Sequence, residues 1–389
     1  MKIKFRAVIV LGLILFAGLA VGSRPGSAAG QKTLIKTEDG VPVVYNSKKP
    51  APPAGVPSSL TLKHDLTIGR ESGDENYMFS ELRSVQVDDQ ENIYALDMKE
   101  IKVRVYDKSG KHLRTFGKKG KGPGEIDTPL RMEMTPGKNL VIEDFASAKF
   151  VFFSLEGACV KEIPLGKYQF LIRFKFNSQG NIYADARTYD ETKSISELIK
   201  FSPDFKPLAT VASFEASIRR APRALTAFSP AFSLQVTGKD NLIWTIAQTD
   251  KYELTVMNAD GKTIRRIVKD YDPTKVTGAM KNKLIEDSFG EQGIPAGYTF
   301  DVPSHLPAVY YFIIDDQDRL FVRTYEFEEK GDGPWFYYDV FDAEGRHVTR
   351  FCLPEREMIF VSKKNKLYCM VQESEEGIPQ VKRYDMTWK

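Results

Sequence analysis

The sequence predicts an all-β fold made of six repeated four-stranded units. One phrase occurs six times: a short alternating strand, a polar turn, an anchor residue and a second apolar strand. The anchors are Asn92, Asn139, Asn181, Asn241, Arg319 and Lys366. After each copy except the last come a third β segment, a second turn and a fourth strand. Such a unit cannot bury both of its faces alone, so we expect the units to pack radially as the blades of a six-bladed β-propeller.

The second turns support this register. They lie at 107–110, 154–157, 202–205, 258–261 and 342–345, and each opens with Asp, Asn or Ser. Gly closes all of them except one, because Gly adopts positive φ without strain. A β-sandwich is the alternative, but that fold would not explain why the strand–turn–strand phrase occurs six times with the same internal spacing.

The last blade lacks a strand. After the segment 381–386 the sequence continues only to Lys389, without a fourth strand. Residues 60–69, LTLKHDLTIG, precede the first blade and have the pattern of an outer strand. We expect this N-terminal strand to complete the last blade and close the ring, because pairing the two removes an open sheet edge.

The residues before that strand divide into a leader and a linker. Residues 1–29 have a basic head from Lys2 to Arg6, an apolar run over 7–22 and a small-residue cleavage site at Ser27, Ala28 and Ala29. The pattern predicts a signal peptide, with an uncleaved anchor as the alternative. No Cys follows the run, so lipid attachment is not expected. The sequence thus predicts a secreted or periplasmic protein, with a hairpin and Pro-rich linker at 30–59 and the propeller at 60–389.

Charge excludes one class of partner. The chain has 55 Lys and Arg against 52 Asp and Glu, but four of the cations and no acid lie in the leader. Without the leader, 51 basic residues face 52 acidic ones. We therefore expect no nucleic-acid binding.

One segment departs from the β pattern. Between the fourth and fifth blades, in the segment 272–307, the residues Met280, Leu284, Ile285 and Phe289 recur at helical spacing. Thr277 can cap the start of a helix and Gly290 its end. We expect a short helix on one face of the propeller, and a small hairpin ending at 43–45 packed outside it.

The cysteines do not form a disulfide framework. Cys159, Cys352 and Cys369 are few and scattered, so we expect small buried hydrophobic side chains. A bridge between Cys352 and Cys369 is the alternative.

The phrases ENIYALD and KNLVIED, with the segments that follow them, resemble NHL repeats, and the chain resembles exported bacterial six-bladed β-propeller proteins. In that pattern an Asp lies five residues after the anchor, as do Asp97 and Asp144. Asp185 lies one position early, and Thr324 takes the place of this Asp in the fifth blade. The resemblance implies that these Asp residues bind turn amides more often than a metal.

Three arginines are the candidate ligand-binding residues. Arg131 and Arg173 lie eight residues before their anchors, where the inner strand begins, and Arg83 lies one position off. If they converge, they form a positive ring suited to a carboxylate, sulfate or phosphate group. The alternative is that each Arg pairs with an acid of the neighbouring blade.

Other motifs are weaker. Arg219, Arg220 and Arg223 form a basic group between the third and fourth blades, most simply a solvated loop. The Gly- and Lys-rich loop 117–125 lacks the ending of a P-loop. The four His residues show no zinc spacing, so no metal site is predicted, although calcium held by several blades is possible. Part of the aromatic run 335–338 could stack against a sugar ring.

The favoured function is an exported, non-enzymatic binding propeller that recognises a protein, peptide or glycan of the cell envelope at the face that the helix shapes. No cofactor is expected. The alternative is a divalent-cation-dependent propeller hydrolase or lyase acting on a lactone, peptide-derived or sugar substrate. A purely structural envelope component is a third interpretation. The fold does not decide among them.

Overall fold

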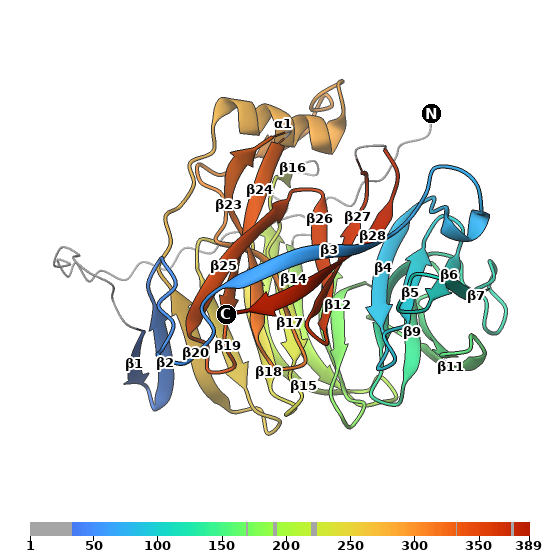
Figure 1. Cartoon of the computed structure of the whole chain (residues 1–389), viewed down its shortest axis with the longest axis horizontal. Helices are drawn as coiled ribbons and strands as arrows, with labels where there is room; N and C mark the ends of the chain where they lie inside the picture. The colour runs from blue at the N-terminus through green and yellow to red at the C-terminus, as the bar shows by residue number, and fades with distance from the viewer. Residues whose placement is uncertain (1–32, 169, 190–192, 219–223, 332, 375–376) are drawn as a thin grey trace.

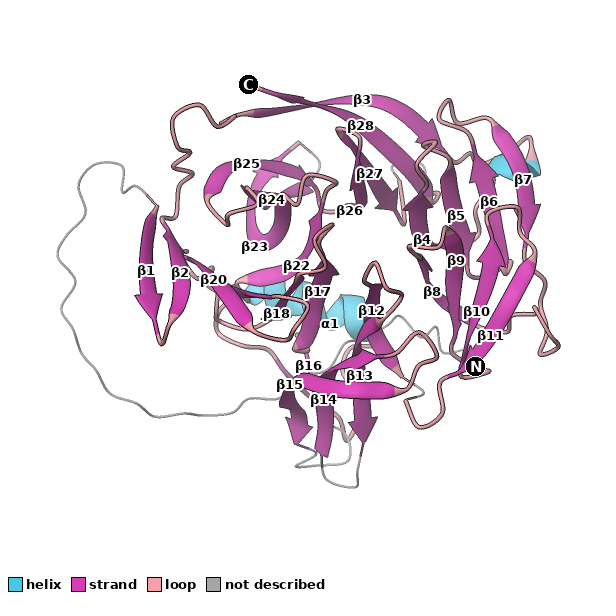
Figure 2. Ribbon diagram, turned by 90° about the horizontal axis from the view of Figure 1, so that it is seen from below, coloured by secondary structure: helices cyan, strands magenta, loops and turns pink. Residues whose placement is uncertain are grey.

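A computed structural model describes residues 33–168, 170–189, 193–218, 224–331, 333–374 and 377–389. Six antiparallel sheets are arranged around a central axis, as Figure 2 shows. Each sheet supplies one blade, and one strand of each blade lies innermost. The protein is therefore a six-bladed β-propeller, as the sequence predicts.

The blades are numbered in chain order, and their strands run outward from the axis. Blades 1 to 3 consist of β4 (Leu82–Val87), β5 (Ile93–Asp97), β6 (Lys102–Tyr106) and β7 (His112–Phe116); β8 (Pro129–Met134), β9 (Asn139–Asp144), β10 (Lys149–Ser154) and β11 (Cys159–Pro164); and β12 (Leu171–Phe176), β13 (Ile182–Tyr189), β14 (Lys193–Phe201) and β15 (Pro207–Ile218). Blades 4 to 6 consist of β17 (Ala231–Val236), β18 (Leu242–Ala247), β19 (Glu253–Met257) and β20 (Thr263–Lys269); β22 (Val309–Ile314), β23 (Leu320–Lys330), β24 (Gly333–Phe341) and β25 (His347–Pro354); and β26 (Glu357–Lys363), β27 (Lys366–Val371), β28 (Gln380–Trp388) and β3 (Leu60–Ile68).

The ring closes through blade 6. Strand β3 pairs antiparallel with β28, from Ile68 opposite Val381 to Leu60 opposite Trp388 (Figure 1). The segment predicted from its pattern thus supplies the missing outer strand. A one-turn 3-10 helix, η1 (Glu75–Tyr77), then leads into blade 1.

The anchor residues have a common backbone role. In five blades the anchor N–H donates to a side-chain oxygen four residues earlier, at 2.8 to 3.1 Å; the acceptors are Asp88, Thr135, Asn177, Thr237 and Asp315. Blade 6 instead turns through Lys364 and Asn365, both with positive φ, as a two-residue type I′ hairpin requires. Because the anchor contributes its backbone, its side chain can change from Asn to Arg.

Each interface between blades has its own apolar cluster. The six clusters lie between successive blades, including blades 6 and 1. Between blades 2 and 3, for example, Phe150 packs on Phe174 with ring centroids 4.7 Å apart. The core is therefore a ring of interfaces, and the innermost strands are free to present polar side chains to the axis.

The N-terminal hairpin widens blade 4. Strands β1 (Leu34–Glu38) and β2 (Val41–Asn46) form an antiparallel pair, and β2 pairs parallel to β20. Val43 and Val44 are buried by this contact. The hairpin lies outside the ring, at its outer edge (Figure 2).

The insert between blades 4 and 5 holds the one α-helix of the described residues, α1 (Gly278–Phe289). Thr277 caps its start by accepting from the Met280 N–H, and Gly290 ends it with φ at 73°. Two short parallel strands, β16 (Ala224–Thr226) and β21 (Thr299–Asp301), join the insert to the chain before blade 4. Phe289 packs against Phe300 of β21 at 5.1 Å, so α1 is fastened over one face of the ring (Figure 1).

The cysteine prediction was wrong in part. All three thiols are free, and only Cys369 is buried. Cys159 is exposed on the outer strand β11, and Cys352 is half-buried on β25 beside Glu328 and Lys330. Outer strands face solvent on one side, which the local sequence pattern did not reveal.

Candidate ligand-binding site

The three predicted arginines lie on the inner strands of three successive blades, Arg83 on β4, Arg131 on β8 and Arg173 on β12. Burial lowers the pKa of Arg83 and of Arg173, and the positive charge of Arg131 lowers both further. Arg131 thus lies near enough to each of the other two guanidinium groups to act on its charge. We call these three residues the arginine mouth.

The three arginines differ in their partners. Arg131 donates from Nη1 to Glu143 Oε2 at 2.8 Å and to the Leu171 carbonyl at 2.7 Å. Within the described residues, Arg83 and Arg173 make no ion pair and no side-chain hydrogen bond. Pairing with an acid of the neighbouring blade is therefore not seen, since Glu143 belongs to the same blade as Arg131.

Two buried acids face this cluster. Burial raises the pKa of Glu143 above its ordinary value, although the charge and hydrogen bond of Arg131 oppose the rise. Burial likewise raises the pKa of Asp185 to about 6, against a hydrogen bond from Ser196 and the charge of Arg173. Three cations and one directly paired acid leave the arginine mouth with net positive charge.

The next layer of the inner strands is neutral by contrast. Gln86, Glu133 and Lys175 lie six residues before their anchors, in blades 1 to 3. Lys175 pairs with Glu133 at 2.6 Å, and Gln86 donates to the same carboxylate at 3.3 Å. The unpaired positive charge is therefore confined to the layer where the inner strands begin.

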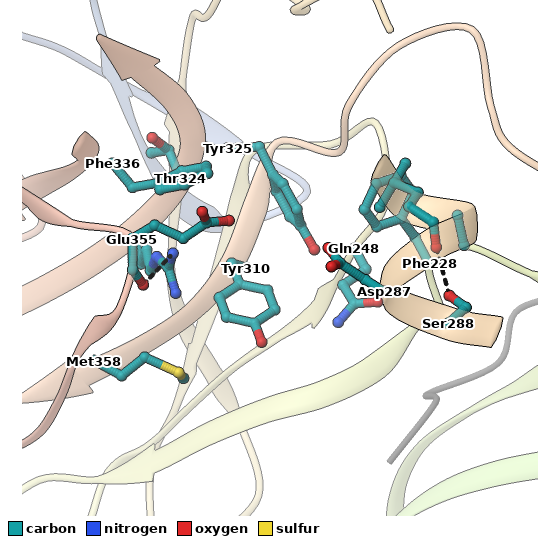
Figure 3. A pocket seen from close by; sticks show the side chains of 13 residues that line it. Phe228, Gln248, Asp287, Ser288, Tyr310, Thr324, Tyr325, Phe336, Glu355 and Met358 are labelled. Atoms are coloured by element: carbon teal, nitrogen blue, oxygen red, sulfur yellow. Dashed lines mark hydrogen bonds between the residues drawn. The ribbon is translucent and has the colours of Figure 1, made fainter. Parts of the chain in front are cut away.

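A cavity of about 400 Å³ continues this layer on blades 5 and 6. Met358 lies eight residues before its anchor, like Arg131 and Arg173, and Tyr310 lies nine before, like Arg83. Both line the cavity, and helix α1 forms its opposite wall with Leu284 and Asp287. Figure 3 shows Tyr310 and Tyr325 between the side of the cavity that carries Glu355 and the side that carries Asp287 (Figure 3). We call this space the α1 cavity.

Arg323 of β23 is the cation of the α1 cavity. It is only 6% exposed, and its guanidinium lies 4.9 Å from the centre of the Tyr310 ring and 4.6 Å from that of Phe336. Its Nη2 donates a 3.5 Å hydrogen bond to the Glu355 carbonyl, and among the described residues Arg323 has no acidic partner. Sequence reasoning missed Arg323 and Tyr310, although the register of the repeats places Tyr310 in the same layer as Arg83.

The recurring Asp residues serve the backbone. Asp97 accepts from the amides of Ser80 and Glu81, and Asp144 accepts from those of Asp127 and Thr128. Asp185 accepts from the Phe232 amide of the next blade at 2.8 Å. In the part of the chain that the structure describes, no group of three or more His, Cys, Asp or Glu side chains is placed to hold a metal ion.

The remaining sequence candidates lie elsewhere. Arg219, Arg220 and Arg223 fall outside the described residues, as does the predicted signal peptide. In the loop 117–125, Glu125 binds Lys118 at 2.6 Å and the Gly122 amide at 3.0 Å. Of the aromatic run, Tyr338 is fully buried, whereas Phe336 lines the α1 cavity.

The chain is similar to known propellers. A sequence family described as "6-bladed beta-propeller", DUF5128, matches residues 72–222, and no curated protein matches the sequence. The resemblance to NHL repeats is not confirmed by this match and stays a prediction. In the described residues, no helix is long and apolar enough to cross a membrane.

Three solved structures illustrate the likeness. A Bacteroides fragilis protein described as exported has 12% identity and a TM-score of 0.55, over 89% of this chain and 99% of that one. A DUF4221 family member from Bacteroides vulgatus has 11% identity and a TM-score of 0.50, over 86% and 100%. Virginiamycin B lyase from Staphylococcus aureus has 8% identity and a TM-score of 0.42, over 84% and 99%. At these identities the likeness is one of fold alone.

Proposed function

We propose that the protein is an exported, non-enzymatic binding protein whose partner carries an anionic group that the arginine mouth holds. The observation that carries this proposal is the pair of guanidinium groups, Arg83 and Arg173, that lie beside Arg131 without an acidic partner. Export is supported by the signal-peptide pattern of residues 1–29 and by the description of the Bacteroides fragilis propeller.

The energetics favour a ligand over a purely structural role. Clustered, desolvated like charges cost folding free energy unless a counter-charge is supplied. A carboxylate, sulfate or phosphate supplies that charge and accepts the paired hydrogen bonds of a guanidinium group. The partner is a protein, peptide or glycan that presents such a group at the face covered by α1.

Thermal melting tests the proposal. We expect the melting temperature to rise by several degrees in sodium sulfate relative to sodium chloride of equal ionic strength, because a ligand that binds only the folded state stabilises it by mass action. Arg131→Gln and Arg173→Gln should reduce the rise to the smaller, general stabilisation that sulfate gives to folded proteins. Lys262→Gln, an exposed substitution on the outer turn of blade 4, should retain the full rise. An equal rise in wild type and both arginine variants would refute anion binding at the arginine mouth.

A further inference from the structure

The α1 cavity and the arginine mouth belong to one layer of the propeller. Both are made where inner strands begin: Tyr310 of the cavity lies nine residues before its anchor, as Arg83 of the mouth does, and Met358 lies eight before, as Arg131 and Arg173 do. The Tyr310 ring also contacts the guanidinium group of Arg323 inside the cavity. A ligand held by the arginine mouth can therefore extend into the α1 cavity without crossing a blade.

The walls of the α1 cavity are aromatic. Tyr325 meets Phe228 and Tyr310 edge-on, with ring centroids 5.2 and 5.4 Å apart, and Phe336 adds a fourth ring. The volume of the α1 cavity, about 400 Å³, falls in the range of small-molecule sites, about 300–1,000 Å³. Rings of this kind bury the apolar face of a cyclic ligand.

The polar groups of the α1 cavity are arranged by charge. Arg323 lies deep, whereas the carboxylates of Asp287 and Glu355 are exposed at the rim. Within the described residues, the hydroxyls of Tyr310 and Tyr325 make no hydrogen bond, so both can donate to or accept from a ligand. Carboxylates at the rim accept from ligand hydroxyls but repel a second anion.

We propose that the ligand is an acidic carbohydrate, whose anionic group binds among Arg83, Arg131 and Arg173 and whose adjoining sugar ring occupies the α1 cavity. This inference rests on the proposed function and names its ligand class. A sugar ring combines an apolar C–H face for the aromatic walls with several hydroxyl donors for Asp287 and Glu355. Carboxylate and sulfate substituents share the chemistry that an arginine cluster recognises.

Calorimetric titration of the purified protein at low ionic strength tests the ligand class. The probes are trigalacturonate, a sulfated trigalactoside, neutral maltotriose, sodium sulfate and a tripeptide with a free carboxylate. We expect at least one of the two acidic trisaccharides to bind at least tenfold more tightly than maltotriose and than sulfate. Equal affinity for maltotriose would overturn the acidic requirement. Binding of the tripeptide with no acidic saccharide binding would assign the ligand to peptides.

Variants separate the two parts of the site. Leu284→Trp fills the α1 cavity from the helix, and Ile285→Trp is its matched control, because Ile285 lines a different hollow. We expect Leu284→Trp to weaken trisaccharide binding at least tenfold and to leave sulfate binding unchanged. Tyr325→Phe, which removes only a hydroxyl, should weaken it by about threefold to tenfold, as for loss of one hydrogen bond.

The outcomes distinguish the two proposals. If Arg173→Gln abolishes sulfate binding but Leu284→Trp and Tyr325→Phe leave saccharide affinity unchanged, the α1 cavity is not part of the site and the further inference fails alone. If sulfate does not bind and Arg173→Gln changes nothing, the proposed function fails as well.

Discussion

Arg173 and Lys175 lie two residues apart on β12, yet only the lysine has an acidic partner. Replacing Lys175 by Met would leave Glu133 without its cation. Replacing Arg173 by Met would remove a desolvated charge that no acid pairs with directly. We therefore predict that Arg173→Met stabilises the unliganded protein by about 1–3 kcal/mol while abolishing anion binding, and that Lys175→Met destabilises it.

Urea unfolding with and without sulfate measures both effects. A loss of stability in Arg173→Met as large as in Lys175→Met would mean that Arg173 is a structural residue, and it would remove the main support for the binding site.

Two glycines with the same backbone conformation differ in their surroundings. Gly345 has φ at 81° and a Cβ there would lie 2.5 Å from Ile267 of blade 4, whereas Gly261 has φ at 85° and nothing within 4 Å. We predict that Gly345→Ala destabilises the protein by about 2–4 kcal/mol, from backbone strain plus a clash at the blade interface. Gly261→Ala should cost only the strain, about 1 kcal/mol. Equal losses in denaturant unfolding would contradict the role of this turn in blade packing.

At the scale of elements, blades 4 and 5 share a buried ion cluster around Asp339 of β24. Lys269 Nζ lies 3.2 Å from this carboxylate, His347 Nε2 3.4 Å and Arg350 Nε 3.1 Å, and the Tyr252 hydroxyl donates to it at 2.9 Å. Burial alone would raise the pKa of Asp339, but the nearby His347 ring and the charges of Lys269 and Arg350 hold it well below its ordinary value. The ionised carboxylate therefore stabilises this interface.

We predict that Asp339→Asn destabilises the protein at pH 7 by about 3–5 kcal/mol, because it leaves buried cations without their counter-charge. Since the folded pKa is lowered, this stabilisation is present above the ordinary Asp pKa and is lost as the pH falls through the folded value. Denaturant unfolding at pH 7 measures the loss, with the exposed Asp272→Asn as control. A loss no larger than that of the control would show that the cluster contributes nothing.

Some helices and strands could be predicted from the sequence, and others could not. The repeats, the closing strand and the limits of α1 were predictable because each has a local signal: a turn residue, a cap or an alternating run. Strands β16 and β21 were not, because three-residue parallel pairs between distant segments leave no periodicity. The exposure of Cys159 on β11 was missed for a related reason, since the pattern of a strand does not say which blade edge faces solvent.

Of the two parts of the candidate site, the arginine mouth was predicted from the sequence and the α1 cavity was not. Register within the repeats pointed to Arg131 and Arg173, which lie eight residues before their anchors, and to Arg83, which lies nine before, because such residues return to the start of the inner strand. The α1 cavity was not predicted, because it depends on how the insert folds back over blade 5 and on Arg323, which lies in a second strand rather than an inner one.

At the scale of the whole molecule, the charge at the ring centre should respond to pH. Asp185 has a pKa raised to about 6, and Glu143 also has a raised pKa, so both bind protons more tightly when folded. The protonated form of Asp185 stabilises the fold at low pH, and that contribution is lost as the pH rises through its folded pKa of about 6. Acidification through this value removes the negative charge of Asp185, which acts on Arg173.

We predict that sulfate affinity rises by about threefold to tenfold between pH 7.5 and pH 5, because loss of a nearby like charge strengthens anion binding by roughly 1 kcal/mol. Asp185→Asn, which keeps an acceptor for the Phe232 amide, should bind more tightly at pH 7.5 and show a smaller pH dependence. Affinity that falls on acidification, measured by calorimetry at fixed ionic strength, would contradict this arrangement of charges.

Anion binding by the arginine mouth is tested most directly by locating an anion in a crystal of the protein soaked in selenate, a sulfate analogue with an anomalous signal. We expect an anomalous peak within hydrogen-bond distance of Arg83, Arg131 and Arg173, and its loss in an isomorphous Arg173→Met crystal. A well-ordered arginine mouth without a selenate peak, with selenate bound elsewhere on the propeller, would contradict it.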